Sequence, residues 1–356
     1  MDRYRVTSPT SSTIWSIQYL RAIAAIGVVV FHTLTETGHD FEFGATGVDL
    51  FFGISGFLMY YVTQGKSIGP LDFLWRRFLR IAPLYWFATL LTVGATFIRP
   101  GFFWQASRDV SRVVLSLLFV PQNGIDGGIY PVLYQGWTLQ YEAFFYLLFA
   151  LSLLVPGIWR LIAMTAVIGA LTVWGRIAPE SHNPVFLTYT DQIALEFVAG
   201  AWVGWACARR WPGGLGWRCV YLAALIGGWS LLWAAWWYED AWDDLSFVAT
   251  VTAISLILAG SVMLERHHWM PRLRWLRTLG EASYAIYLFQ DFGFVGVAGW
   301  DAGHPIAVRL VLFSVASLAV GLLAYWGLER PFDRLVRKRS SSAVRSASLK
   351  VAVTAP

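Results

Sequence analysis

Arg21 and His32 lie in one apolar stretch of the sequence, Ile17 to Leu34, which is long enough to cross a lipid bilayer. The residues between them, AIAAIGVVVF, carry no charge. Ionisable side chains at membrane depth are costly and normally face a protein interior or a wet cavity, where they serve function. Eleven residues make close to three helical turns, so both side chains leave one helix face, about 16 Å apart along the axis. One helix therefore offers a permanent cation for an anion and a histidine able to act as general base.

Asp49 opens the next apolar segment, GATGVDLFFGISGF, after a short loop. We expect it at about the depth of His32, where a carboxylate can hold the imidazole tautomer as in hydrolytic triads. The alternative role of Asp49 is to cap the helix N-terminus. Gly47, Gly53 and Gly56 would let this helix approach a neighbour or a ligand closely.

Glu142 lies in the aromatic segment GWTLQYEAFFYLLF. An acid there is costly unless it is used or paired, either with an arginine or with His32. We assign it to catalysis, and we assign Trp137 and Tyr141 of the same segment to substrate binding. Ser55 in GISGF breaks the G-x-S-x-G pattern and has no strand context, so we do not expect it to be a nucleophile.

A basic cluster of three arginines, Arg76, Arg77 and Arg80, lies in FLWRRFLRIAPLYW. Arg77 and Arg80, three residues apart at a predicted helix start, share one face and form a fork suited to phosphate. The alternative is an ordinary basic flank of a membrane helix. The sequence has no H-E-x-x-H, no G-x-x-x-x-G-K-[ST] and no G-x-G-x-x-G. We therefore expect no metal and no permanently bound cofactor.

Membrane helices must position these residues. The chain has 356 residues, of which 57% are hydrophobic and 14% charged, against about 25% charged in soluble domains. We predict an all-α, polytopic integral membrane protein with about ten transmembrane helices. The predicted spans are 15–35, 46–64, 81–98, 137–155, 158–178, 190–208, 216–237, 246–264, 282–300 and 306–328. Val113 to Val120 is too short to span and is predicted to be re-entrant or interfacial.

The basic residues orient this bundle. With the N-terminus in the cytoplasm, 22 of the 27 Lys and Arg residues fall at the inner face, as the positive-inside rule requires. Both termini are then cytoplasmic, and the basic isoelectric point needs no nucleic acid partner. We divide the chain into an N-terminal tail (1–14), a transmembrane domain (15–332) and a basic, Ser-rich tail (333–356) expected to be disordered.

Six motifs in order resemble the membrane-bound acyltransferase family 3. They are IQYLRAIAAIGVVVFH, FGATGVDLFFGISGFLM, RRFLRIAPLYW, GWTLQYEAFFY, GEASYAIYLFQ and LERPF. The opening motif, with Gln18 where many members have Asp, resembles the exopolysaccharide O-acetyltransferase branch. One departure is Gln290, which stands where many members have His at the end of the SYxxYL segment.

The resemblance implies a ten-helix enzyme of the inner membrane that moves an acyl group, usually acetyl, from cytoplasmic acyl-CoA to a polysaccharide or lipid-linked glycan. It implies that His32 and Arg21 are the essential pair, that Arg77 and Arg80 are the family's R-x-x-R, and that Glu142 is its conserved acid. The expected scheme has the arginines hold the CoA phosphates while His32 accepts the proton of a sugar hydroxyl. An acyl-histidine relay is the variant.

Two functions from other classes remain open on the sequence alone. A transporter also places charges inside a membrane bundle, although the sequence lacks matching halves with Gly/Pro-broken segments. A non-catalytic partner in a glycan synthase or export complex would need neither Arg21 nor His32. The acyl group and the acceptor are left undetermined by the residues.

Overall fold

The computed structural model describes residues 13–39, 41–242, 244–300 and 303–336. Helices are the only regular secondary structure in these ranges, apart from one isolated β-bridge between Asn123 and Ile129. The all-α prediction is therefore confirmed. The expectations for most of the two tails, residues 1–12 and 337–356, lie outside the described residues.

Every predicted span contains a helix, and the short Val113–Val120 segment overlaps a helix of eight residues, α4. The elements are α1 (Trp15–Glu36), η1 (Glu42–Ala45), α2 (Thr46–Thr63), α3 (Pro70–Ile98), α4 (Val110–Leu117), α5 (Gly136–Ser152), α6 (Trp159–Ile177), α7 (Pro184–Tyr189), α8 (Ala194–Cys207), α9 (Leu215–Trp237), α10 (Glu239–Trp242), α11 (Asp244–Arg266), α12 (Arg274–Val297), α13 (Ile306–Ala324) and the π-helical turn η2 (Tyr325–Glu329).

Seven helical segments of the described chain are long and apolar enough to cross a membrane. They are α1, η1 with α2, α3, α6, α9, α11, and α13 with its continuation. The other three predicted spans are α5, α8 and α12. α5 and α8 have 17 and 14 residues, fewer than the roughly 20 that a straight span needs. The protein is a multi-pass membrane protein, and the number of ten spans stays a prediction.

Helix α3 begins well before the predicted residue 81. It starts at Pro70, and proline is favoured in a first helical turn because its missing N–H group has no intrahelical partner there. Asp72 adds an acid to that turn, where it complements the helix dipole. The arginines of the basic cluster consequently lie inside a continuous helix, two to three turns from its start, which corrects their expected place at the helix start.

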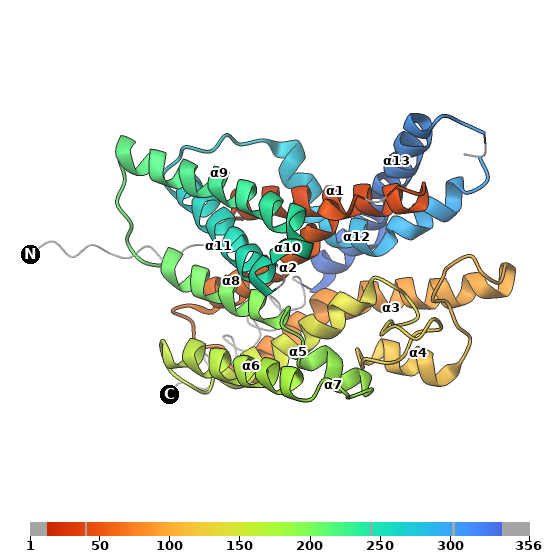
Figure 1. Ribbon diagram of the computed structural model, residues 1–356, viewed down its shortest axis with the longest axis horizontal. Coiled ribbons are helices and arrows are strands. Elements are labelled where there is room, and N and C mark those ends of the chain that lie inside the picture. Colours follow the sequence, from red (N-terminus) through yellow and green to blue (C-terminus); the bar gives the residue numbers. More distant parts are fainter. Residues whose placement is uncertain (1–12, 40, 243, 301–302, 337–356) are drawn as a thin grey trace, which may run out of the picture.

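Two groups of helices lie on either side of α2 and α8 (Figure 1). α1, α9, α11 and α12 run along the upper part of the view, and α3 to α7 along the lower part. Small residues let α2 touch its neighbours. Gly56 of α2 lies against the backbone carbonyl of Phe197, and Gly200 of α8 lies against that of Gly53. The close approach expected at Gly47, Gly53 and Gly56 is confirmed, since all three meet a neighbouring helix.

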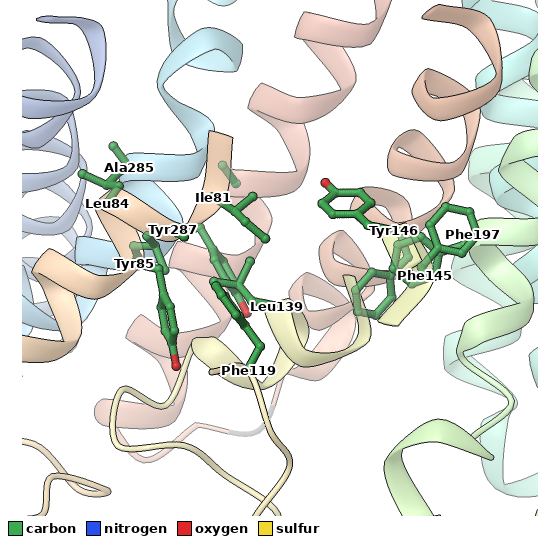
Figure 2. Packing of buried hydrophobic residues seen from close by; sticks show 14 of the residues in the cluster. Ile81, Leu84, Tyr85, Phe119, Leu139, Phe145, Tyr146, Phe197, Ala285 and Tyr287 are labelled. Carbon is green, nitrogen blue, oxygen red and sulfur yellow. The ribbon is translucent and has the colours of Figure 1, made fainter. Parts of the chain in front are cut away.

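Aromatic packing fixes α5 against its neighbours (Figure 2). Phe145 of α5 stacks on Phe197 of α8 with ring centroids 4.4 Å apart. The hydroxyl of Tyr146 points away from this pair. On the other side, Leu139 of α5 lies beside Ile81 and Tyr287. α5 thus packs between α8 on one side and, on the other, α3 and α12, which carry arginines and tyrosines of the site described next.

Candidate active site

A cavity of about 120 Å³ opens between α1, α2, α3, α5 and α12. We call it the arginine cavity because Arg21, Arg77 and Arg80 line it. Its other polar lining residues are Ser55, Thr138, Glu142, Tyr146, Ser283, Tyr284 and Tyr287. The rest of the wall is apolar, so charges inside it are screened less than in water. Four predicted site residues, the three arginines and Glu142, therefore meet in one place.

Glu142 is held by two hydroxyl groups. Helical spacing places Tyr146 one turn after Glu142 on the same face, and the Tyr146 hydroxyl donates to Glu142 Oε1. Ser55 Oγ, from α2, donates to the same oxygen at 2.9 Å. Hydroxyl donors stabilise a carboxylate. Glu142 thereby supplies a fixed negative group opposite the arginines, and Ser55 acquires a role in the site as its partner.

Arg21 and Arg77 keep their positive charge available. Arg21 Nε donates to Ser283 Oγ of α12 at 3.0 Å. The Arg77 guanidinium lies over the rings of Phe73 and Tyr146, with Cζ 5.5 and 6.0 Å from the two centroids. Within the described residues, neither guanidinium has a carboxylate oxygen within 4.0 Å. Both cations can therefore bind an anion that enters the cavity.

Arg80 is already neutralised. Its Nη1 lies 2.8 Å from Glu329 Oε1 and 3.2 Å from Asp333 Oδ2. Glu329 is only 4% exposed and sits on the π-helical turn η2, a rare form often found at functional sites. Arg80 can take a phosphate only by exchanging these partners, which distinguishes it from Arg77.

Arg76 lies apart from the other two arginines. It is exposed and does not line the arginine cavity, because consecutive residues of a helix point about 100° apart. Of the three arginines of the basic cluster, Arg77 and Arg80, the predicted phosphate fork, share the cavity. A contribution of Arg76 to phosphate binding stays a prediction.

His32 lies beyond the wall of the arginine cavity. It is half-buried, and its ring meets the edge of Tyr134 with centroids 6.1 Å apart. Tyr134 precedes α5, whose first turn closes the cavity on this side. There Thr138 Oγ1 donates to the Tyr287 hydroxyl at 3.1 Å, and that hydroxyl donates to the Gln135 carbonyl at 3.2 Å. The start of α5 thus separates the arginines from His32.

The expected depth of Asp49 needs correction. The segment before α2 folds back along α1, with Gly44 against Gly27, so that Gly47 meets the Ala24 carbonyl. Eight residues of helix separate Ala24 from His32, about 12 Å along the axis. Asp49 instead lies close enough to the buried Glu196 side chain of α8 for the two carboxyl groups to interact. The structure thus brings Asp49 to a second carboxyl group and not to His32.

Trp137 and Tyr141 pack beside the arginine cavity without lining it. Their rings lie 6.4 and 6.0 Å from Phe52 and 6.0 Å from each other. Both belong to the partly buried shell around the main hydrophobic core. Their assignment to substrate binding stays a prediction.

Several residues that line the cavity or pair with its arginines were not singled out from the sequence, although motifs contained them. Ser283, Tyr284 and Tyr287 all come from the GEASYAIYLFQ segment, and Glu329 comes from LERPF. Tyr146 follows Glu142 by one helical turn, which is a spacing that could have indicated a contact. Among the described residues, no three His, Cys, Asp or Glu side chains are grouped so as to hold a metal ion.

Comparison with known proteins shows which protein family this chain belongs to. The family described as Acyltransferase domain matches residues 14–326. The exopolysaccharide production protein ExoZ of Rhizobium meliloti, strain 1021, is 36% identical over 320 residues, which cover 88% of this chain and 98% of that protein. No solved structure matches.

Two O-acetyltransferases share part of the chain. The O-acetyltransferase OatA of Staphylococcus aureus, strain NCTC 8325, is 33% identical over 147 residues, covering 37% of this chain and 23% of OatA. The peptidoglycan O-acetyltransferase OatA of Listeria monocytogenes is 28% identical over 228 residues, covering 58% of this chain and 36% of that protein.

Proposed function

Because the chain belongs to acyltransferase family 3, we propose that it is an O-acetyltransferase that uses acyl-CoA from the cytoplasm and acetylates a glycan hydroxyl outside it. The acyltransferase class follows from the family, and the helices make the protein a multi-pass membrane protein. The acyl-CoA donor, the glycan acceptor and the inner-membrane location are parts of the proposal. The likeness to a protein of exopolysaccharide production and to O-acetyltransferases supports them.

The arginine cavity is the observation that carries the proposal. Arg21 and Arg77 lie at its predicted cytoplasmic end without a carboxylate partner in the described chain. The phosphates of CoA are anions of the kind that guanidinium groups bind with two parallel hydrogen bonds. A transporter or a non-catalytic scaffold is less favoured, because the family is one of acyltransferases.

The distance between Arg21 and His32 suits the donor. Eleven helical residues place them about 16 Å apart along α1, which is comparable to the length of the pantetheine arm. In the proposal the phosphates stay with Arg21 and Arg77, and Arg80 joins them when Glu329 or Asp333 releases it. The arm then follows α1 past the first turn of α5 and carries the thioester to His32.

The chemical step is a transfer between two nucleophiles. His32 accepts the proton of the sugar hydroxyl as its oxygen attacks the thioester carbonyl. The C–S bond then breaks, the acetyl ester forms, and the CoA thiolate takes up a proton to leave as the thiol. His32 has Tyr134 as its nearest polar aromatic neighbour, so its orientation depends on the start of α5 and not on Asp49. An acyl-histidine intermediate is the stepwise form of the same reaction.

Replacement of His32 tests the proposal. Purified protein with acetyl-CoA and a glycan acceptor should release CoA and acetylate the acceptor. We expect His32→Ala to lower the rate of transfer at least 100-fold, since general base catalysis contributes about 10²–10⁴. The dissociation constant of acetyl-CoA should change little, because His32 does not line the arginine cavity. Full transfer by a folded His32→Ala protein would refute the proposed base.

A further inference from the structure

A second cavity lies at the end of the bundle predicted to face the cytoplasm. Its volume is about 910 Å³, and it is bordered by the start of α1, the ends of α2, α8 and α11, and the loop from 267 to 273. We call it the basic cavity because Lys66, Arg266, His268 and Arg272 line it. It shares no lining residue with the arginine cavity, so it is a separate feature of the molecule.

The basic cavity has one carboxylate, Glu265, and the fold already uses it. Glu265 Oε1 accepts the backbone N–H of Trp15 at 2.8 Å, and Oε2 accepts the backbone N–H and the hydroxyl of Ser16 at 2.7 and 2.6 Å. The free N–H groups at the start of α1 thus bind this carboxylate. Its negative charge is directed at the helix end and not at the four basic groups.

The basic groups are not neutralised by carboxylates. Arg266 donates to the carbonyls of Cys207 and Arg209, both at 2.7 Å. Arg272 lies over the Trp15 ring with Cζ 5.9 Å from the centroid. Within the described residues, no carboxylate oxygen lies within 4.0 Å of a side-chain nitrogen of these four residues. The cavity therefore carries a net positive charge that favours binding of an anion.

His268 has a left-handed backbone conformation, which residues other than glycine adopt less often. It follows the end of α11 with φ of 60°. The N–H groups of His268 and Trp269 donate to the carbonyls of Glu265 and Leu264, both at 2.9 Å. These two bonds form a Schellman motif, whose left-handed residue is usually glycine. Glycine would suit this backbone best, and the chain instead places an imidazole at the cavity wall.

We propose that the basic cavity binds a phosphate ester. Its basic groups suit phosphate oxygens, and Trp15 and Tyr61 in its wall offer aromatic faces to the organic part of the ligand. Two sources share this chemistry: the head group of an anionic phospholipid, and a soluble nucleotide phosphate. This proposal can be tested independently of the proposed acetyl transfer, since binding is measured without turnover.

The test measures binding to the full-length protein in neutral detergent. The probes are dihexanoyl phosphatidylglycerol, adenosine 3′,5′-bisphosphate and, as the zwitterionic comparison, dihexanoyl phosphatidylcholine. We expect one of the two anionic probes to bind at least tenfold more tightly than phosphatidylcholine. Preference for phosphatidylglycerol identifies a lipid site, and preference for the bisphosphate identifies a nucleotide site.

Variants locate the binding. Lys66→Ala with Arg272→Ala should weaken the preferred probe at least tenfold, whereas Arg210→Ala, an exposed arginine predicted on the same face and outside both cavities, should not. Arg77→Ala, in the arginine cavity, should leave phosphatidylglycerol binding unchanged and should weaken bisphosphate binding less than the double variant does. His268→Gly removes the imidazole and suits the left-handed backbone, so it should weaken binding without lowering the melting temperature.

Two results would overturn the proposal. One is equal binding of the three probes by the unaltered protein. The other is a loss of binding with Arg77→Ala or Arg210→Ala as large as the loss with Lys66→Ala and Arg272→Ala, which would assign the effect to the arginine cavity or to general surface charge. His268→Gly keeps the test valid if the double variant is poorly folded.

Discussion

Glu142 shows how one residue connects the two halves of the arginine cavity. It accepts hydrogen bonds from Ser55 of α2 and Tyr146 of α5, and the ring of Tyr146 lies under the Arg77 guanidinium. A change at any of these residues therefore acts on the arginine that we propose for phosphate binding. Arg80 belongs to a different set, since Glu329 and Asp333 bind it from the opposite end of the chain.

The difference between adjacent arginines is testable at this scale. Arg77→Ala should raise the KM for acetyl-CoA roughly ten- to hundredfold, because hydrogen bonds to charged groups contribute about 1.5–3 kcal/mol. Arg76→Ala should leave the KM within about twofold, because Arg76 is exposed and does not line the cavity. Steady-state kinetics on both purified variants provides the measurement. Equal effects of the two substitutions would contradict the geometry.

At the scale of the elements, close helix contacts hold the site in place. α2 carries Ser55 between two glycines, and each glycine meets a different neighbour: Gly53 meets Ile254 of α11, and Gly56 meets the backbone of α8. α2 is thereby fixed from two sides, and Ser55 is presented to Glu142. Small residues permit such contacts in membranes, where packing replaces the hydrophobic effect between helices.

A methyl group at this crossing should destabilise the protein. In Gly56→Ala the added Cβ would collide with the carbonyl of Phe197, and overpacking costs about 1–3 kcal/mol. Gly94→Ala is the matched control, because Gly94 lies inside α3 with no atom near its would-be Cβ. It should be neutral or stabilising by roughly 0.5–1 kcal/mol. Thermal unfolding in detergent compares the two variants, and a Gly56→Ala protein as stable as the control would disprove the tight crossing.

At the scale of the whole molecule, the predicted orientation assigns each end of the bundle to a side of the membrane. The arginine cavity has its arginines toward the predicted cytoplasmic end, and His32 lies toward the other. Cys219, exposed near the start of α9, falls on the cytoplasmic side, and His182, exposed between α6 and α7, falls on the outer side.

Labelling with a membrane-impermeant maleimide tests this orientation. In sealed right-side-out vesicles, Cys219 should remain unlabelled and a His182→Cys variant should be labelled. Permeabilised vesicles should label both positions, which serves as the control for reactivity. Cys207 is buried and should stay unlabelled throughout. Labelling of Cys219 in sealed vesicles would reverse the orientation and place the arginines outside the cytoplasm.

The amino-acid sequence by itself determined the membrane class, the all-α fold, the family and the candidate residues Arg21, Arg77, Arg80 and Glu142. These follow from apolar length, helical spacing and ordered motifs, which are local properties of the chain. The positions of the membrane helices were also predicted, except that α3 starts at Pro70 and α12 at Arg274, before the predicted residues 81 and 282. Charged residues in the first turns hid both starts, because apolar length reports the membrane part of a helix only.

Only the tertiary structure decided which of these residues meet. Asp49 lies close to Glu196 because the loop before α2 folds back along α1, and no spacing in the sequence encodes that depth. Arg80 is neutralised by Glu329, more than 200 residues away, whereas Arg77 is not. His32 stands apart from the arginine cavity because the start of α5 lies between them. Contacts between distant segments depend on how helices cross, and crossing is set by packing of the whole bundle.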